Sequence, residues 1–374
     1  MLRPRDLPAA ALGLAAGALT ARARGRRRLE VANAHARRHL EAELAKRVVP
    51  TPQEQRERTY VDALLQRPEP EDRDVGTEST GPIAARLTEA DRAAVIDRLD
   101  SEPARLWDAA NQGLRTRLIL SFAVAYDISE ALEHTGLSSA MPPDDVHAMA
   151  RGALVAGGDT FLADLVMGAV ANAGLALPPG GRVLDFGSSS GRVIRMIAAG
   201  RPDASCLACD PNSGAIAWAA EHLPGIEFFV SPLHPPLDLE SGSLDLVYAI
   251  SIWSHFAAEA GLAWLSEMHR VLRPGGALVM TTHGFDCLAT RLRRGDVSAA
   301  TAAEAAAALI ASGHHFVDVF GEEGDWGVKD PGWGEAYFTL DWLMSNAGGA
   351  WSARLLWPGV LDRTQDLVVL ERQP

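Results

Sequence analysis

Residues Arg182–Arg192 read RVLDFGSSSGR, a short apolar run followed by a loop with a glycine at each end. The apolar run predicts a buried strand, and the residues from about Arg192 onward predict a helix. Glycines permit a tight turn and let the backbone approach a ligand closely. The free N–H groups at the start of a helix attract anionic or polar groups. We therefore interpret this stretch as a strand–loop–helix unit that cradles a nucleotide-like ligand.

Short apolar runs alternate with helical segments throughout the rest of the chain. Continuous apolar strands separated by helices are typical of a parallel sheet covered on both faces. Only eight residues separate the last two runs, which is too few for a helical crossover, so we expect these two strands to pair antiparallel. The pattern predicts an α/β fold with a doubly wound, seven-stranded sheet and a terminal antiparallel hairpin. The predicted strands are 182–186, 205–209, 227–230, 244–250, 277–282, 353–357 and 366–370.

Polar residues follow several of these strands. Asp210 ends the second strand, 25 residues after Asp185, and an acid at this place can accept hydrogen bonds from both ribose hydroxyls of a nucleoside. It could instead be a helix cap, and the glycine loop could be a packing turn, but the combination favours a ligand site. His255 and His283 follow the fourth and fifth strands, so both are expected to face the crevice and either could accept a hydroxyl proton. Each could instead pack against its own helix or loop.

The glycine loop resembles a known motif. The segment VLDFGSSSG, 183–191, is similar to the first motif of class I S-adenosylmethionine-dependent methyltransferases, hh-D/E-x-G-x-G-x-G, with Ser189 at the middle glycine. Segments 241–256 and 272–284 look like the family's fourth-strand and fifth-strand motifs. Within the class, SIWSH at 251–255, His283-Gly284 and QDLVVL at 365–370 resemble bacterial enzymes of carbohydrate and natural-product pathways.

This resemblance implies a cofactor, a reaction and a set of site residues. The cofactor is S-adenosylmethionine, and the acceptor is expected to be the oxygen of a small molecule or glycan. His255 and His283 are the catalytic candidates. The residues expected to bind the cofactor are Asp185, Gly187, Ser188, Ser189, Ser190, Gly191, Arg192, Asp210, Pro211 and Ile250.

Two other functions compete with this hypothesis. A nicotinamide oxidoreductase would need G-x-G-x-x-G at the first turn, whereas Gly187 and Gly191 have only serines between them. The chain could also be a catalytically silent nucleotide-binding scaffold that acts through its basic arm and its helical front end.

The net charge of −13 is unevenly distributed. Residues 1–50 hold 11 basic and 4 acidic side chains, and the rest of the chain holds 24 and 44. An acidic body argues against a nucleic acid partner, because phosphate binding needs a basic face. We interpret the basic arm as a frayed segment, and the alternative is that it makes weak contact with an anionic membrane surface. The arginines in 22–28 disfavour export, so we expect a cytoplasmic protein.

We divide the chain into four parts. They are a basic Ala/Arg-rich arm at 1–50, a linker at 51–86, a helical extension or cap at 87–174, and a cofactor-binding methyltransferase domain at 175–374. Thr88 and Asp91 predict a capping box, and longer helices are expected at 102–128 and 160–172. Cys206 and Cys209 have no second pair to complete a zinc site, so we expect packed thiols and no metal.

A long insertion at 284–335 follows the fifth strand and is expected to be a lid. It contains an alanine-rich segment, about 298–312, that predicts a helix. Several aromatic residues lie in and after its acidic loop, and they could contact a sugar ring or a cation, or only pack the lid on the body. They are Trp326, Trp333, Tyr337 and Phe338.

Overall fold

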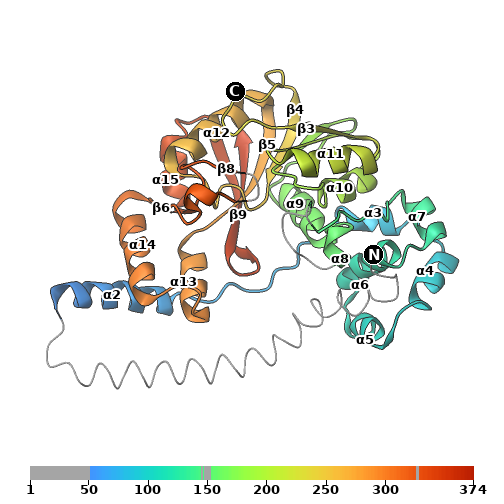
Figure 1. Cartoon of the computed structure of the whole chain (residues 1–374), viewed down its shortest axis with the longest axis horizontal. Coiled ribbons are helices and arrows are strands. Elements are labelled where there is room, and N and C mark those ends of the chain that lie inside the picture. The colour runs from blue at the N-terminus through green and yellow to red at the C-terminus, as the bar shows by residue number, and fades with distance from the viewer. Residues whose placement is uncertain (1–50, 145, 147–152, 326–327) are drawn as a thin grey trace.

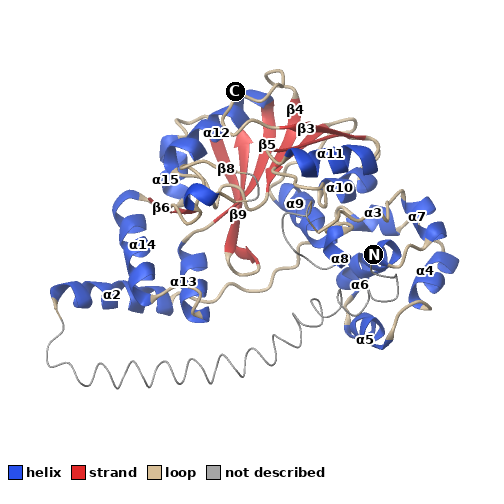
Figure 2. Cartoon of the chain, viewed as in Figure 1, coloured by secondary structure: helices blue, strands red, loops and turns tan. Residues whose placement is uncertain are grey.

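The computed structural model of the chain describes residues 51–144, 146, 153–325 and 328–374 (Figure 1). The arm predicted at 1–50 and Trp326 lie outside the described residues. The described part contains a central sheet, a group of helices that precedes it in sequence, and an insertion that carries its own small sheet (Figure 2).

The central sheet has seven strands in the order β3-β2-β1-β4-β5-β9-β8. The pairs among β1 to β5 are parallel, whereas β9 pairs antiparallel with both β5 and β8. This order confirms the predicted α/β fold with a terminal hairpin. The strands are β1 Arg182–Phe186, β2 Ser205–Asp210, β3 Ile226–Val230, β4 Leu244–Ala249, β5 Leu272–Thr282, β8 Trp351–Leu361 and β9 Gln365–Arg372.

Alternate residues of the inner strands supply two separate hydrophobic layers, because successive strand side chains point to opposite faces. Val183 packs with one layer and Leu184 with the other. Helices α9, Thr160–Asn172, and α10, Ile194–Gly200, cover the first face, and α12, Ala258–Val271, and α15, Leu340–Asn346, cover the second (Figure 1). Helix α11, Ser213–His222, connects β2 to β3.

The helical extension packs on the first face through α9. The window Leu154–Asn172 is apolar and long enough to cross a membrane, but 78% of it is buried inside the protein, as expected of a core helix. The predicted capping box at Thr88 and Asp91 is confirmed. The other helices of the extension are α3 Thr80–Ala84, α4 Glu89–Ile96, α5 Ser101–Ala109, α6 Gln112–Ala125, α7 Ser129–Thr135 and α8 Ala153–Ala156.

Two expectations for this half of the chain differ from the structure. The single helix predicted over 102–128 is divided into α5 and α6, because Asn111 leaves the helical path and its side chain accepts from the Leu114 N–H at 2.9 Å. The predicted linker 51–86 contains α3 and helix α2, Pro52–Gln66. Helix α2 packs on the insertion through Leu64, where Arg67 pairs with Asp286 at 2.7 Å.

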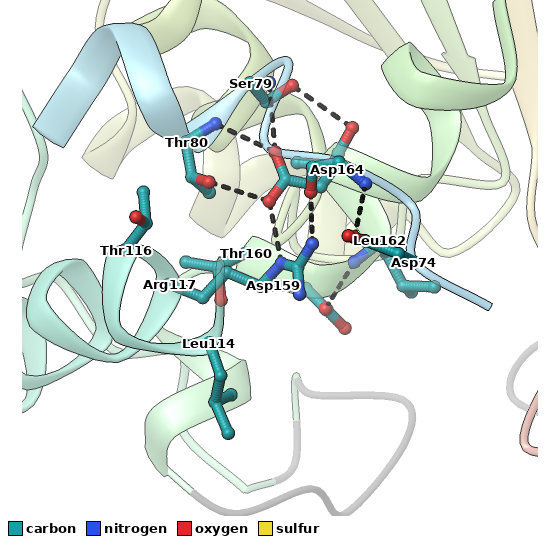
Figure 3. A network of polar contacts seen from close by, with 12 residues as sticks. Asp74, Ser79, Thr80, Leu114, Thr116, Arg117, Asp159, Thr160, Leu162 and Asp164 are labelled. Carbon is teal, nitrogen blue, oxygen red and sulfur yellow. Dashed lines mark hydrogen bonds and ion pairs between the residues drawn. The ribbon is translucent and has the colours of Figure 1, made fainter. Parts of the chain in front are cut away.

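A buried carboxylate joins α3 and α6 to α9 (Figure 3). Asp164 of α9 is completely buried. It accepts from the Ser79 N–H at 3.0 Å, from the Thr80 N–H at 2.9 Å and from the Thr80 hydroxyl at 2.7 Å. The Arg117 guanidinium donates at 2.8 Å to the same oxygen as the Thr80 hydroxyl, and the two N–H groups share the other oxygen. This charge is therefore fully paired, and it fixes the segment before α4 to the core helix.

The insertion contains two helices where the sequence predicted one. Helix α13, Phe285–Arg294, and helix α14, Ala299–Ser312, pack with α2 around a hydrophobic cluster of their own. Strands β6, His314–Val317, and β7, Glu335–Phe338, then form an antiparallel pair. The chain between these two strands reaches back to the edge of the central sheet where β4 ends.

Candidate active site

A cavity of about 250 Å³ lies where β1, β2 and β4 end, at the edge that the sequence predicted. The residues after these strands form one side of it, and the insertion forms another. It brings together nine of the predicted site residues: Asp185, Gly187, Ser188, Ser189, Arg192, Asp210, Pro211, Ile250 and His255.

The loop after β1 makes its turn with three residues at positive φ. Gly187, Ser189 and Gly191 have φ of 86°, 49° and 77°. Ser189 therefore holds the left-handed conformation that favours glycine, at the position where the family motif has one. A non-glycine residue in this region costs of order 1–3 kcal/mol, and such strain clusters at functional sites. Helix α10 begins only at Ile194, two residues later than predicted.

Two of the predicted cofactor residues do not line the cavity. Ser190 is buried, and Gly191 is also buried, with Leu223 and Phe228 so close that a Cβ there would lie 3.0 Å from each. Gly191 has a positive φ. The structure thus places these two residues within the loop but not among those that line the cavity, and their contact with the cofactor stays a prediction.

Asp210 holds the loop in place. One carboxylate oxygen accepts from the Ser189 N–H at 2.8 Å, and the other accepts from the Asn212 N–H at 2.8 Å. Burial raises the pKa of Asp210, and these two backbone bonds oppose that shift. The side chain therefore reaches the cavity while fixing the loop that it faces.

Asp185 of β1 is buried beside Tyr248 of β4, its partner across the strands. Its Oδ2 atom is buried and has no hydrogen-bond partner among the described residues. Burial raises the pKa of Asp185 to about 7, and the nearby Asp210 charge adds to this. A carboxyl oxygen without a partner near the end of β1 is a polar atom that a ligand could satisfy.

Asp185→Asn should change the pH dependence of stability. The raised pKa means that the folded state holds a proton that the unfolded state releases above about pH 4, so stability falls as pH rises toward 7. Asparagine has no such proton, so its melting temperature relative to wild type should rise by a few degrees between pH 5 and pH 8. Differential scanning calorimetry without ligand measures this. A difference that does not vary with pH contradicts it.

Arg192 is held by the helical extension. Its guanidinium forms an ion pair with Asp159, the residue that caps α9, and the Asp159 N–H donates to the Arg192 carbonyl at 2.8 Å. Both side chains are nearly buried. The extension thus contributes directly to the loop after β1. Sequence reasoning missed Asp159, because its only local signal is that of a helix cap.

His255 lines the cavity, and the insertion orients it. Its Nδ1 lies 2.7 Å from the Gly334 carbonyl oxygen, which can only accept, so Nδ1 carries the proton. The Trp333 ring stacks on the imidazole at a centroid distance of 4.7 Å. Burial lowers the pKa of His255. The neutral ring therefore keeps an unprotonated Nε2.

His283 does not line this cavity, although its place after β5 predicted that it would. The side chain is buried, and its ring lies 5.3 Å from that of Tyr337. The Phe338 N–H donates to the His283 carbonyl at 2.9 Å, so β7 covers this residue. Burial lowers the pKa of His283 to about 3. The structure therefore places a buried histidine with a lowered pKa behind β7, outside the set of residues that line the cavity.

A polar network that was not predicted as part of the site joins β4, β5 and β9. The Ser251 N–H donates to the Thr281 hydroxyl at 2.7 Å, and that hydroxyl donates to Gln365 Oε1 at 2.6 Å. Gln365 Nε2 donates to the Ser251 hydroxyl at 2.9 Å. Ser251 has φ of 60°, and both Ser251 and Gln365 line the cavity. Ser251 and Gln365 lie in the segments SIWSH and QDLVVL, which the sequence analysis used only as a resemblance to bacterial methyltransferases.

The insertion closes one side of the cavity with Asp325, Val328 and Trp333. Its backbone pairs with the segment after β4: the Gly334 N–H donates to the His255 carbonyl, and the Ala257 N–H donates to Gly332, each at 2.8 Å. Of the predicted aromatic residues that the structure describes, only Trp333 lines the cavity.

Two other described residues of this group pack inside the protein. Tyr337 and Phe338 are buried in the core. No group of metal-ligating side chains occurs among the described residues. Cys206 and Cys209 are free, buried thiols.

Comparison with known proteins agrees with this geometry. Residues 183–276 match a family described as "Methyltransferase domain". The chain is 34% identical over 116 residues to a malonyl-[acyl-carrier protein] O-methyltransferase of Methylococcus capsulatus, covering 30% of this chain and 41% of the relative. It is 31% identical over 105 residues to a trans-aconitate 2-methyltransferase of Methylobacterium nodulans, covering 26% and 37%. The chain thus spans less than half the length of these relatives.

A solved structure also resembles this chain. It is a SAM-dependent methyltransferase of Methanosarcina mazei with a TM-score of 0.40 and 19% identity, covering 53% of this chain and 94% of that one. The family match spans β1, the glycine loop, Asp210 and β4, which form one side of the cavity. The sheet order, the loop after β1 and this match identify the fold around the cavity as that of the class I S-adenosylmethionine-dependent methyltransferases.

Proposed function

We propose that this protein transfers a methyl group from S-adenosylmethionine to a hydroxyl oxygen of a small molecule or glycan. The observation that carries the proposal is the single cavity that joins the loop after β1, Asp210 and the unprotonated Nε2 of His255. The two named relatives act, by their names, on malonyl-[acyl-carrier protein] and on trans-aconitate. They support methyl transfer without naming the acceptor of this chain.

The residues of the cavity fit the cofactor. Asp210 offers carboxylate oxygens for ribose hydroxyls, and Pro211 and Ile250 provide apolar surface beside it. The Ser189 hydroxyl is buried and has no hydrogen-bond partner among the described residues, so it is a donor without an acceptor. When bound, S-adenosylmethionine supplies an electrophilic methyl group on its sulfonium.

The chain itself has two tasks in such a reaction. The first is to hold the acceptor in line and to exclude water, since orientation alone can lower a barrier by on the order of 7–11 kcal/mol. The insertion and the segment after β4 enclose the cavity for this purpose. The second is to remove the proton of the acceptor hydroxyl, which the lone pair of His255 Nε2 can accept. The proton then resides on Nε2 while the Gly334 carbonyl holds Nδ1.

Isothermal titration with S-adenosylhomocysteine tests the cofactor site. Asp210→Ala should weaken the affinity about 10–100-fold, because it removes charged hydrogen bonds to the ribose. The surface variant Asp203→Ala should bind as wild type does. Calorimetric melting checks that Asp210→Ala remains folded. Tight binding that ignores Asp210→Ala contradicts the ribose assignment, and a wild-type protein that does not bind at all contradicts the proposed function.

A further inference from the structure

The cavity has walls that the cofactor assignment leaves without a role. The loop after β1, Asp210 and the end of β4 account for the side assigned to S-adenosylmethionine. The polar side chains His255, Asp325, Gln365 and Ser251 and the ring of Trp333 lie on the remaining wall, beside apolar residues such as Ile252 and Val328. An acceptor must lie against these residues if the proposed function holds, so their chemistry restricts the kind of acceptor.

Positive charge is scarce in this cavity. Among the described lining residues, Arg192 is the one side chain with a permanent positive charge. Its guanidinium is paired with Asp159, and side-chain exposures of 12% and 8% leave both groups largely out of water. An ion pair of this kind has no net charge to offer a second anion. The cavity therefore has no free cation, within the part described, for a carboxylate or a phosphate.

Asp325 places an acid on the acceptor wall. Its carboxylate accepts from the Trp333 indole N–H at 3.3 Å. Its backbone exchanges two hydrogen bonds with Val328, at 2.9 and 2.8 Å, and these fix the backbone from which the side chain extends. No described lysine, arginine or histidine forms an ion pair with it, although Asp330 nearby is paired with His234 at 2.9 Å. The negative charge of Asp325 is thus uncompensated.

The other polar groups of this wall suit hydroxyls. Nε2 of His255 can accept a hydrogen bond from a hydroxyl. The Ser251 hydroxyl and the Gln365 amide are groups that both donate and accept hydrogen bonds. Trp333 adds an aromatic surface beside them. A ring with several hydroxyls can donate to Asp325 and to His255 at once. A carboxylate has only acceptor atoms and would meet like charge at Asp325.

We propose that this wall is a subsite for an uncharged polyhydroxylated ring, and that Asp325 excludes acceptors carrying a carboxylate or a phosphate beside the reacting hydroxyl. The proposal rests on the proposed function, because it assumes that the acceptor lies next to the cofactor. It also distinguishes this chain from a relative whose name gives aconitate, a carboxylate, as its substrate.

The test uses two probes that differ in one group, methyl glucoside and methyl glucuronide. Each is titrated into the protein saturated with S-adenosylhomocysteine, and binding is measured by saturation-transfer NMR and calorimetry. Wild type should bind the glucoside at least about tenfold more tightly than the glucuronide, from like-charge repulsion. Asp325→Asn should reduce this preference to about threefold or less. Glu322→Gln, which removes an exposed charge of the same insertion, should leave it unchanged.

Two results overturn the proposal. If wild type binds the glucuronide as tightly as the glucoside, Asp325 does not exclude charged acceptors. Wild type that binds neither sugar, while it still binds S-adenosylhomocysteine, rejects a polyhydroxylated ring as the occupant. A failure to bind S-adenosylhomocysteine is measured before any sugar is added, and it counts against the proposed function alone.

Discussion

Replacing Asp164 by alanine should lower the free energy of unfolding by about 3–5 kcal/mol, the usual cost of removing one partner from a buried ion pair. The carboxylate is completely buried and accepts four hydrogen bonds, from Ser79, Thr80 and Arg117. The variant leaves the Arg117 charge and two backbone N–H groups without their acceptor. It also releases the segment that connects α2 to the helical extension. Chemical denaturation followed by circular dichroism measures the change.

Asp203→Ala is the matched control for this experiment. Asp203 also pairs with an arginine, Arg201, at 3.1 Å, but the two side chains are 45% and 23% exposed. An exposed pair contributes about 0–1 kcal/mol. If Asp164→Ala costs no more than Asp203→Ala, the buried network does not hold the extension to α9.

The sheet could be predicted because its physical signals are local. Inner parallel strands are buried on both faces, so they are continuous apolar runs, and the eight-residue connection at the end of the chain permits only a hairpin. Helix α2 had a local signal too. Thr51, Pro52 and Glu54 form a capping box with proline at the first turn, but the prolines and charges around them made a linker the simpler interpretation.

The site was predictable only where the topology brings strand ends together. The loop after β1, Asp210 and His255 all follow directly on strands whose ends meet at the cavity, so their place could be predicted. That of His283 could not, because its place after a strand says nothing about what covers it, and β7 covers it from 55 residues further along the chain. Asp325 and Gln365 reach the cavity, and Asp159 reaches Arg192 beside it, through contacts between distant segments. The Ser251–Gln365 bond, for example, joins residues 114 positions apart.

His255→Ala should lower kcat for methyl transfer about 10²–10⁴-fold, the usual contribution of a positioned general base. The affinity for S-adenosylhomocysteine should stay within about twofold of wild type, since binding energy there comes from the loop after β1 and Asp210. Transfer of labelled methyl from S-adenosylmethionine to a hydroxyl acceptor that wild type methylates gives kcat and KM. His283→Gln changes a histidine outside the cavity and separates catalysis from packing. If His255→Ala raises KM for the acceptor and leaves kcat unchanged, His255 binds the acceptor and is not the base.

The pH profile separates a base from a residue that only positions the acceptor. A base must be neutral, and burial lowers the pKa of His255, so kcat should stay level near pH 7 and fall only as pH drops below 6.5. The Asp325 charge acts in the opposite direction and raises this pKa. Asp325→Asn should therefore move the acid limb of kcat to lower pH, because the protonated, cationic form of His255 then loses the negative charge that stabilises it. If Asp325→Asn leaves the limb in place, the titrating group is not His255, and the proton leaves the acceptor by another route.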